Sequence, residues 1–292
     1  MSNSIAFIGF GEAGQAFAWP GARAFDAKTG SPVTRTAMLG AYASTGVEGS
    51  LEASTALVGA GTVLVVVTAD QALAAARDYA PLLGPGALWL DMNSVAPGTK
   101  RAAAVVIEAA GGRYVDVAIM APVLPVGRGV PLLVSGPHAE AASAILNEIG
   151  FRQVATAGSR VGQASAIKMI RSVMVKGIEA VAAEMCLAAN RAGVSDAILA
   201  SLEASRSDRP WADGVDYNLN RMLAHGLRRA AEMEEAAKTL EDLGIDPVMT
   251  RGTVFRQREL GALGIDPPPG LAAKLAAIDP DRLAVARKEP AA

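Results

Sequence analysis

The sequence predicts an α/β fold in which a doubly wound, mostly parallel sheet is followed by an all-helical second domain. Up to about residue 156, short apolar runs alternate with longer Ala-rich segments, the pattern of a parallel sheet wrapped by helices. After Gly158 the strand-like runs stop, and apolar residues recur at helical spacing. We therefore expect one domain over residues 1–160 and a second over residues 161–292.

The strands expected in the first domain are short apolar runs bounded by Gly, Pro or polar residues. They are Ile5–Ile8, Ala22–Phe25, Val63–Val67, Leu88–Leu90, Arg113–Val115, Leu132–Val134 and Arg152–Ala155. Two helices between them have clear boundaries. Gln71–Leu83 ends at Gly84-Pro85-Gly86, a stop signal, and Pro97–Ala110 carries its proline in the first turn, where a missing N–H matters least.

The second domain is expected to begin with one long helix over residues 161–192, because no proline interrupts the stretch and Gly193 follows it. Its Ile167, Ile170 and Met174 are expected to pack away from a polar strip. Further helices are expected at Ser195–Ser205, Tyr217–Leu243 and Pro247–Leu260, and a break of the second of these near Gly226 is an alternative. We expect Asp266–Gly270 to be a rigid connector and the tail after Ala286 to be loose.

Composition excludes several classes of protein. The net charge of -2 over 292 residues gives no basic surplus for nucleic acid or an anionic membrane. Cys186 is the only cysteine, which excludes an intrachain disulfide and a thiolate metal cluster, and we expect it in the core. The apolar run Val63–Val67 is too short to span a bilayer. With no metal-ligand spacing and no signal-type segment, we expect a metal-free cytoplasmic protein.

The opening of the chain carries the clearest functional pattern. The strand Ile5–Ile8 leads directly into Gly9-Phe10-Gly11-Glu12-Ala13-Gly14, a Gly-x-Gly-x-x-Gly turn before an Ala-rich helix. In this context Gly9 permits the tight turn, Gly11 lets a phosphate approach the backbone, and Gly14 lets the helix pack on the strand. Free N–H groups at a helix start favour an anion. The pattern predicts a Rossmann-type domain that binds a dinucleotide.

The next strand ends in Asp26, which can accept hydrogen bonds from both ribose hydroxyls and repels a 2′-phosphate. This favours NAD, although Lys28 just beyond would soften the repulsion and leaves NADP open. Thr68 and Ala69, after the third strand, and Asn93, after the fourth, complete the expected cofactor site.

Hydride chemistry also needs a group that handles the proton of a small-molecule substrate. Three segments have polar groups where strands end or the long helix begins: Asp91–Pro97, Asp116–Pro122 and Gly162–Ser172. Lys168 and Ser172 are four residues apart and share a helix face. A lysine there can accept the proton of a substrate hydroxyl as hydride leaves and return it in the reverse direction.

These segments, in this order, resemble the β-hydroxyacid dehydrogenase superfamily over about residues 5–190. The resemblance implies that Lys168 is catalytic, because Gly162 to Lys168 matches the Gly-x(5)-Lys segment of the family. Asp91–Pro97 matches its Asp-x-Ser-Thr-x-x-Pro segment, with Asn93 and Ser94 in place of Ser-Thr. The family also implies a homodimer through the helical domain, and His225–Met233 resembles a subgroup with a carboxy-terminal domain of unknown function.

The chain departs from the family at substrate-binding positions. Ser172 replaces an Asn, and in Asp116–Pro122 Met120 replaces a Ser while Pro122, after Ala121, replaces a Gly. Pro122 has no N–H and Met120 no hydroxyl, so the usual carboxylate cradle cannot form. We expect a bulkier or less polar hydroxy acid, or an amino or imino analogue. Other candidate anchors for a carboxylate are His225, Arg228 and Arg229.

The leading hypothesis is an NAD(P)-dependent oxidoreductase that interconverts a β-hydroxy acid, or a related hydroxy compound, and its carbonyl. Lys168 is the general acid/base, Ser172 assists it, and Asn93 and Ser94 position substrate and nicotinamide. Two alternatives stay open: an imine or iminium reductase on the same scaffold, and a sensor that binds NAD(H) without turnover.

Overall fold

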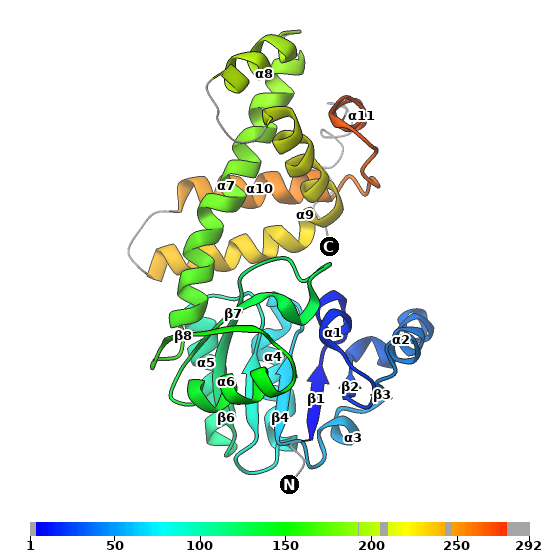
Figure 1. Cartoon of the computed structure of the whole chain (residues 1–292), viewed down its shortest axis with the longest axis vertical. Coiled ribbons are helices and arrows are strands. Elements are labelled where there is room, and N and C mark those ends of the chain that lie inside the picture. The colour runs from blue at the N-terminus through cyan, green and yellow to red at the C-terminus, as the bar shows by residue number, and fades with distance from the viewer. Residues whose placement is uncertain (1–3, 192, 205–209, 243–246, 279–292) are drawn as a thin grey trace. The chain divides into compact units, whose positions relative to one another are not determined.

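The computed structural model describes residues 4–191, 193–204, 210–242 and 247–278 (Figure 1). The chain forms two compact units, unit 1 (Met1–Met169) and unit 2 (Ile170–Ala292). The division falls within one helix, and the domain boundary expected at residue 160 stays a prediction. The tail after Ala286 and the side chains of Cys186 and Trp211 lie outside the described residues.

Unit 1 is built on an eight-stranded sheet with the order β3-β2-β1-β4-β5-β6-β7-β8. The strands are β1 (Ile5–Ile8), β2 (Arg23–Phe25), β3 (Glu48–Ser50), β4 (Thr62–Val65), β5 (Leu88–Asp91), β6 (Arg113–Ile119), β7 (Pro131–Ser135) and β8 (Gln153–Gly158). All neighbours pair in parallel except β6 and β7. The predicted α/β class and its mostly parallel sheet are confirmed. The sequence analysis missed β3, an edge strand without an apolar run.

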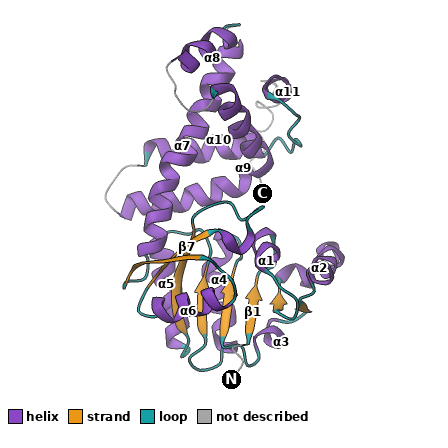
Figure 2. Ribbon diagram, in the orientation of Figure 1, coloured by secondary structure: helices purple, strands orange, loops and turns teal. Residues whose placement is uncertain are grey.

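Two layers of helices cover this sheet (Figure 2). The helices of unit 1 are α1 (Glu12–Phe17), α2 (Pro32–Thr45), α3 (Ala53–Leu57), α4 (Ala72–Tyr79), α5 (Pro97–Ala109) and α6 (Ala139–Glu148), with 3-10 turns at η1 (Ala27–Gly30), η2 (Ala69–Gln71), η3 (Ala80–Leu82) and η4 (Gly127–Gly129). Successive strand residues point to opposite faces. Leu64 and Val117 accordingly share a core with α1, α2 and α6, whereas Val63 and Tyr114 share another with α3, α4 and α5.

The secondary structure described in unit 2 is helical. Unit 2 contains most of α7 (Gln163–Arg191) and all of α8 (Ser195–Ala204), α9 (Trp211–Asp242), α10 (Val248–Gly261) and α11 (Leu271–Ala277). The break considered at Gly226 was wrong, because α9 is continuous through it. A Cβ at Gly226 would lie 2.2 Å from the carbonyl oxygen of Gln257, and one at Gly261 would lie 2.4 Å from the nitrogen of Leu227. The two glycines therefore allow α9 and α10 to cross at backbone contact.

The faces of α7 differ from the sequence expectation. Ile167, Ile170 and Met174 do not pack but are 45%, 49% and 66% exposed. The buried face instead carries polar residues, among them Lys176 and Glu179. They are buried because α9 supplies partners: Lys176 pairs with Glu232, and Glu179 with Arg229. Among the helices described, none has an apolar stretch long enough to cross a membrane.

Candidate active site

The glycine turn follows β1 at the point where the strand order reverses, between β1 and β4. Gly9 has φ +85°, and a Cβ there would lie 2.7 Å from the carbonyl oxygen of Val66. A Cβ at Gly14 would lie 2.9 Å from the carbonyl oxygen of Gly9, so helix and turn are in backbone contact. Gly11 has no atom within 4 Å of its Cβ position. The room over Gly11 fits the close approach of a phosphate.

Asp26 joins the end of β2 to this turn. Its Oδ2 accepts a hydrogen bond from the N–H of Phe10 at 2.7 Å, and its Oδ1 accepts one from the N–H of Lys28 at 2.8 Å. A carboxylate oxygen accepts two hydrogen bonds, so each retains acceptor capacity for a ribose hydroxyl. Lys28 is exposed beside it in η1, and Glu12 and Ala13 continue the turn into α1.

Asn93 follows β5, and its side-chain oxygen is an acceptor without a hydrogen-bond donor among the described residues. Its backbone N–H and its Nδ2 both donate to Asp91 Oδ1, at 3.0 and 2.7 Å. Because only Nδ2 can donate to a carboxylate, the amide orientation is fixed and Oδ1 faces elsewhere. Asn93 Oδ1 is buried and has no hydrogen-bond partner among the described residues. An acceptor of this kind fits a ribose hydroxyl or carboxamide donor of a dinucleotide.

The carboxyl ends of neighbouring parallel strands gather the other candidates. β4 pairs with both β1 and β5, so the glycine turn, Thr68 and Asn93 follow adjacent strands at one edge of the sheet. Thr68 is exposed and Ala69 is half-buried at the start of η2. This is the edge at which open α/β sheets bind their ligands.

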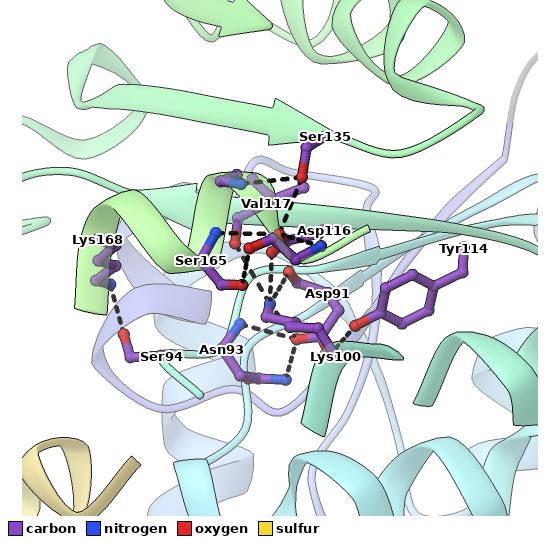
Figure 3. Close-up of polar contacts among 12 residues, drawn as sticks. Asp91, Asn93, Ser94, Lys100, Tyr114, Asp116, Val117, Ser135, Ser165 and Lys168 are labelled. Carbon is purple, nitrogen blue, oxygen red and sulfur yellow. Dashed lines mark hydrogen bonds and ion pairs between the residues drawn. The ribbon is translucent and has the colours of Figure 1, made fainter. Parts of the chain in front are cut away.

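Lys168 reaches the same region from the second turn of α7. Its Nζ donates a hydrogen bond to Ser94 Oγ at 2.5 Å, and Ser94 follows Asn93 in the loop after β5 (Figure 3). Both side chains are half-buried. The fold therefore joins two predicted residues that are 74 positions apart in the sequence.

Other predicted residues lie further along the chain. Met120, Ala121 and Pro122 follow β6, where the N–H of Met120 donates to the carbonyl oxygen of Pro131 at 2.8 Å. Ser172 is buried one helical turn after Lys168. On α9 of unit 2, His225 and Arg228 are exposed, and Arg228 lies 3.8 Å from Glu232 in an ion pair. Arg229 is buried against Glu179. Their part in substrate binding stays a prediction.

The sequence analysis missed a buried polar cluster under this edge (Figure 3). Lys100 is fully buried, and its Nζ donates to the carbonyl oxygen and the Oδ1 of Asp91 at 2.6 and 3.0 Å. The same Nζ lies 3.5 Å from Asp116 Oδ1. Tyr114 donates from its hydroxyl to Asp91 Oδ2 at 2.6 Å. Burial and the nearby Asp91 carboxylate raise the pKa of Tyr114 well above its usual value.

A signal for Lys100 was present in the helical periodicity. Lys100 shares its spacing with Ala103, Ala104 and Ile107, all of which are buried in α5. A lysine at i with apolar residues at i+3, i+4 and i+7 lies on the core face of a helix. A charge in that place needs a buried partner, which Asp91 at the end of β5 and Asp116 in the middle of β6 supply.

Comparison with known proteins agrees with this arrangement. Residues 4–158, more than half of the chain, match the family described as the NAD binding domain of 6-phosphogluconate dehydrogenase. The chain belongs to the β-hydroxyacid dehydrogenase-like family. Residues 189–260 match a domain of unknown function, DUF1932. A nicotinamide dinucleotide is the cofactor that this family membership supports, and Gly11 and Asn93 fit it.

Solved structures share this fold. A conserved hypothetical protein from Sinorhizobium meliloti is 35% identical, with 99% of this chain and 97% of that chain covered and a TM-score of 0.70. A 3-hydroxyisobutyrate dehydrogenase from Mycobacterium tuberculosis is 18% identical over 100% of both chains, with a TM-score of 0.68. An imine reductase from Pseudomonas sp. is 18% identical over 96% of this chain and 100% of its own, with a TM-score of 0.54.

Proposed function

We propose that the protein is an NAD(P)-dependent oxidoreductase that interconverts a β-hydroxy acid, or a related hydroxy compound, and its carbonyl. The observation that carries the proposal is the hydrogen bond from Lys168 to Ser94, one residue after Asn93 at the cofactor edge of the sheet. The bond holds the amine of Lys168 beside the expected cofactor site, which supports its proposed role as proton carrier. Family membership supports the cofactor and the general class of reaction.

The chain's own residues provide binding, orientation and proton transfer. A bound nicotinamide dinucleotide supplies the hydride chemistry. Lys168 Nζ accepts the proton of the substrate hydroxyl during oxidation and returns it to the carbonyl oxygen during reduction. Ser94 holds Nζ in place through the hydrogen bond that the structure contains, and Ser172 assists one helical turn further along α7. Asn93 Oδ1 accepts from the cofactor or the substrate.

The substrate class follows from the residues after β6. Neither Met120 nor Pro122 has a side-chain hydroxyl that could bind a carboxylate, and Pro122 also has no backbone N–H. We propose that they admit a bulkier and less polar hydroxy acid than the small acids of the family. His225 and Arg228, both exposed on α9, are the proposed anchors for its carboxylate.

NAD is the proposed cofactor in preference to NADP, because the Asp26 carboxylate lies at the glycine turn and repels a 2′-phosphate. The test is the ratio of kcat/KM with NAD to that with NADP. Asp26→Ser should lower this ratio by removing the negative charge, and Glu148→Gln, at the exposed end of α6, serves as the charge-matched control. An unchanged ratio in Asp26→Ser would assign the choice of cofactor to other residues.

The decisive experiment is a dehydrogenase screen with both cofactors over hydroxy, amino and imino acids, comparing the wild type with Lys168→Ala. We expect a hydroxy acid to produce NADH, and loss of the proton carrier to lower kcat by roughly 10²-fold to 10⁴-fold. Lys168→Arg keeps a cation of similar length, but its guanidinium stays protonated and cannot exchange a proton with the substrate, so this variant should lose activity as well. Tight NADH binding by the wild type without turnover of any compound would favour the sensor instead.

Imine reduction is the second candidate, favoured by the apolar Met120 and by the fold shared with the Pseudomonas imine reductase. An iminium carbon accepts hydride with less proton donation than a carbonyl. Lys168→Ala should therefore retain most imine reduction while losing alcohol oxidation. The same pair of proteins separates the two activities in one screen.

A homodimer in the cytoplasm is the proposed setting. The apolar side of α7 is exposed at Ile170, Met174 and Ile178, which gives a second copy an apolar surface to cover. A single cysteine is compatible with a reducing compartment. Sedimentation should give twice the chain mass, and Met174→Lys should shift it toward the monomer.

A further inference from the structure

We infer that Asp116 and Ser135 cap the amino terminus of α7 from the sheet and thereby position Lys168. The inference deepens the proposed function, since it concerns the residue on which the proposed proton transfer rests. It assigns a positioning role to two strand residues that bind the first turn of the helix that carries Lys168.

The two residues are direct partners in the antiparallel pair of β6 and β7, where Asp116 lies opposite Ser135. Ser135 Oγ donates to Asp116 Oδ2 at 3.0 Å, and both residues are fully buried. Opposite residues in an antiparallel pair hold their side chains about 5 Å apart on one face of the sheet. The pair therefore presents two adjacent oxygens as a rigid acceptor surface.

These oxygens receive the free N–H groups at the start of α7. The first four N–H groups of a helix have no intrahelical partner and must be satisfied elsewhere. The N–H groups of Gly162 and Ser165 donate to Asp116 Oδ2 at 3.1 and 3.0 Å, and that of Ala164 donates to Ser135 Oγ at 3.0 Å. The remaining one, from Gln163, donates to the carbonyl oxygen of Arg160 at 3.3 Å.

This cap differs from the ordinary one, which is the side chain of the residue just before the first turn. That position is Gly162, which has no side chain and a φ of +102°. The acceptors come instead from positions 46 and 29 residues earlier than the donors of Gly162 and Ala164. The first turn of α7 is therefore held by strand residues as well as by the local loop.

Charge supports the same reading. Asp91, Asp116 and Lys100 are buried together and carry two negative charges against one positive charge. The amino terminus of a helix carries about half a positive charge, which offsets part of the excess. The amino terminus of α7 therefore stabilises the carboxylate of Asp116, and the carboxylate stabilises the first turn of the helix.

The buried cluster of Asp91, Asp116 and Lys100 also contacts the loop that carries Ser94, the partner of Lys168. Lys100 binds Asp91 and lies against Asp116, and Asp91 Oδ1 accepts both hydrogen bonds of Asn93, the neighbour of Ser94. One buried set of charges therefore fixes the loop that carries Ser94 and the helix that carries Lys168. A misplacement of about 1 Å at such a group can lower a rate by about 10²-fold.

The test compares Asp116→Asn and Ser135→Ala with Val117→Ala, a control that removes buried volume from the same strand and leaves the cap intact. Hydrogen exchange is followed in the cofactor-free chain over a peptide covering residues 160–168. Loss of a cap corresponds to roughly a fivefold to thirtyfold faster local exchange. We expect this in Ser135→Ala and Asp116→Asn, and exchange like that of the wild type in Val117→Ala.

The second measurement is turnover together with the Kd for NADH. Both cap variants should lose about tenfold or more in kcat because Lys168 is misplaced. NADH binding should be unchanged in Ser135→Ala, which leaves the glycine turn and the contacts of Asn93 intact. Unchanged exchange in Ser135→Ala, which keeps the carboxylate and should fold, would overturn the cap. Faster exchange with the kcat of the control would overturn the positioning role. Faster exchange in a chain whose wild type turns over no compound would leave the cap and remove the proposed function.

Discussion

Lys168 Nζ donates a hydrogen bond to Ser94 Oγ, joining the second turn of α7 to the loop that follows β5. Through this hydrogen bond, the hydroxyl of Ser94 restrains the flexible four-carbon side chain of Lys168. A lysine without such a contact loses rotamer entropy of about 2 kcal/mol when it is ordered for a reaction. In the proposed function, this bond orients Lys168 Nζ for proton transfer before a substrate arrives.

The first prediction concerns this hydroxyl. Ser94→Ala should lower kcat by about tenfold to 10²-fold, less than Lys168→Ala, because the proton carrier is present but no longer oriented. Ser94→Thr keeps the hydroxyl and should retain most activity. Steady-state turnover at saturating cofactor checks both, and a Ser94→Ala enzyme as active as the wild type would contradict the role of the contact.

A second prediction separates the glycines of the turn. Gly11→Ala places a methyl group where no protein atom lies within 4 Å, so the fold should be unaffected. The methyl group fills the room over the turn, and the Kd for NADH should rise by at least tenfold. Gly9→Ala is the contrasting variant, since its φ of +85° and the Val66 carbonyl at 2.7 Å oppose a side chain. It should lower the Tm, as calorimetry would show. A lower Tm for Gly11→Ala would contradict the assignment.

The turn was predictable because its information is local: a strand, three glycines and a helix lie within ten residues. The seven predicted strands were found for a similar reason, since apolar residues within a few positions of one another mark each of them. The buried ion pairs of Lys100 were not predicted, because its helical spacing indicates only a core face, and its partners Asp91 and Asp116 lie on β5 and β6, which only the fold brings beside it. The exposed Ile170 and Met174 show the reverse case, in which apolar spacing predicts a buried face that the single chain does not bury.

The third prediction concerns the buried cluster. Lys100→Met removes the cation that pairs with Asp91 and Asp116 and leaves two carboxylates buried. Breaking a buried ion pair in this way lowers the free energy of unfolding by about 3–5 kcal/mol. Urea denaturation checks the value, with the exposed Lys28→Met as the control. The double variant Lys100→Met with Asp116→Asn should recover part of the loss, because one of the unpaired charges is gone.

A fourth prediction concerns alkaline pH. Burial raises the pKa of Tyr42 to about 12 and that of Tyr114 well above its usual value. Unfolded tyrosines lose their protons near pH 10, so the unfolded state binds fewer protons than the folded state above that pH. Stability due to these residues is complete below about pH 10 and is lost as the pH rises toward 12.

Denaturation over roughly pH 9 to 12, from below the pKa of an unfolded tyrosine to that of Tyr42, tests this prediction. The free energy of unfolding should fall less steeply in Tyr42→Phe than in the wild type. Tyr217→Phe, at an exposed position on α9, is the matched control. Parallel slopes for Tyr42→Phe and the wild type would show that Tyr42 does not contribute to the alkaline loss.

The fifth prediction tests the crossing of α9 and α10 with two glycine-to-alanine variants. Gly226→Ala would place a methyl group 2.2 Å from the backbone oxygen of Gln257, and neither helix can yield without losing the contact between them. Overpacking of this kind destabilises by about 1–3 kcal/mol. Gly252 lies inside α10 with no atom within 4 Å of its Cβ position, so Gly252→Ala should instead stabilise by about 0.5–1 kcal/mol. The same chemical change thus has opposite signs at two helical sites, and calorimetry measures both. If Gly226→Ala were as stable as Gly252→Ala, the two helices would not meet at backbone contact, and the fold of unit 2 would need another explanation for a glycine in the middle of its longest helix.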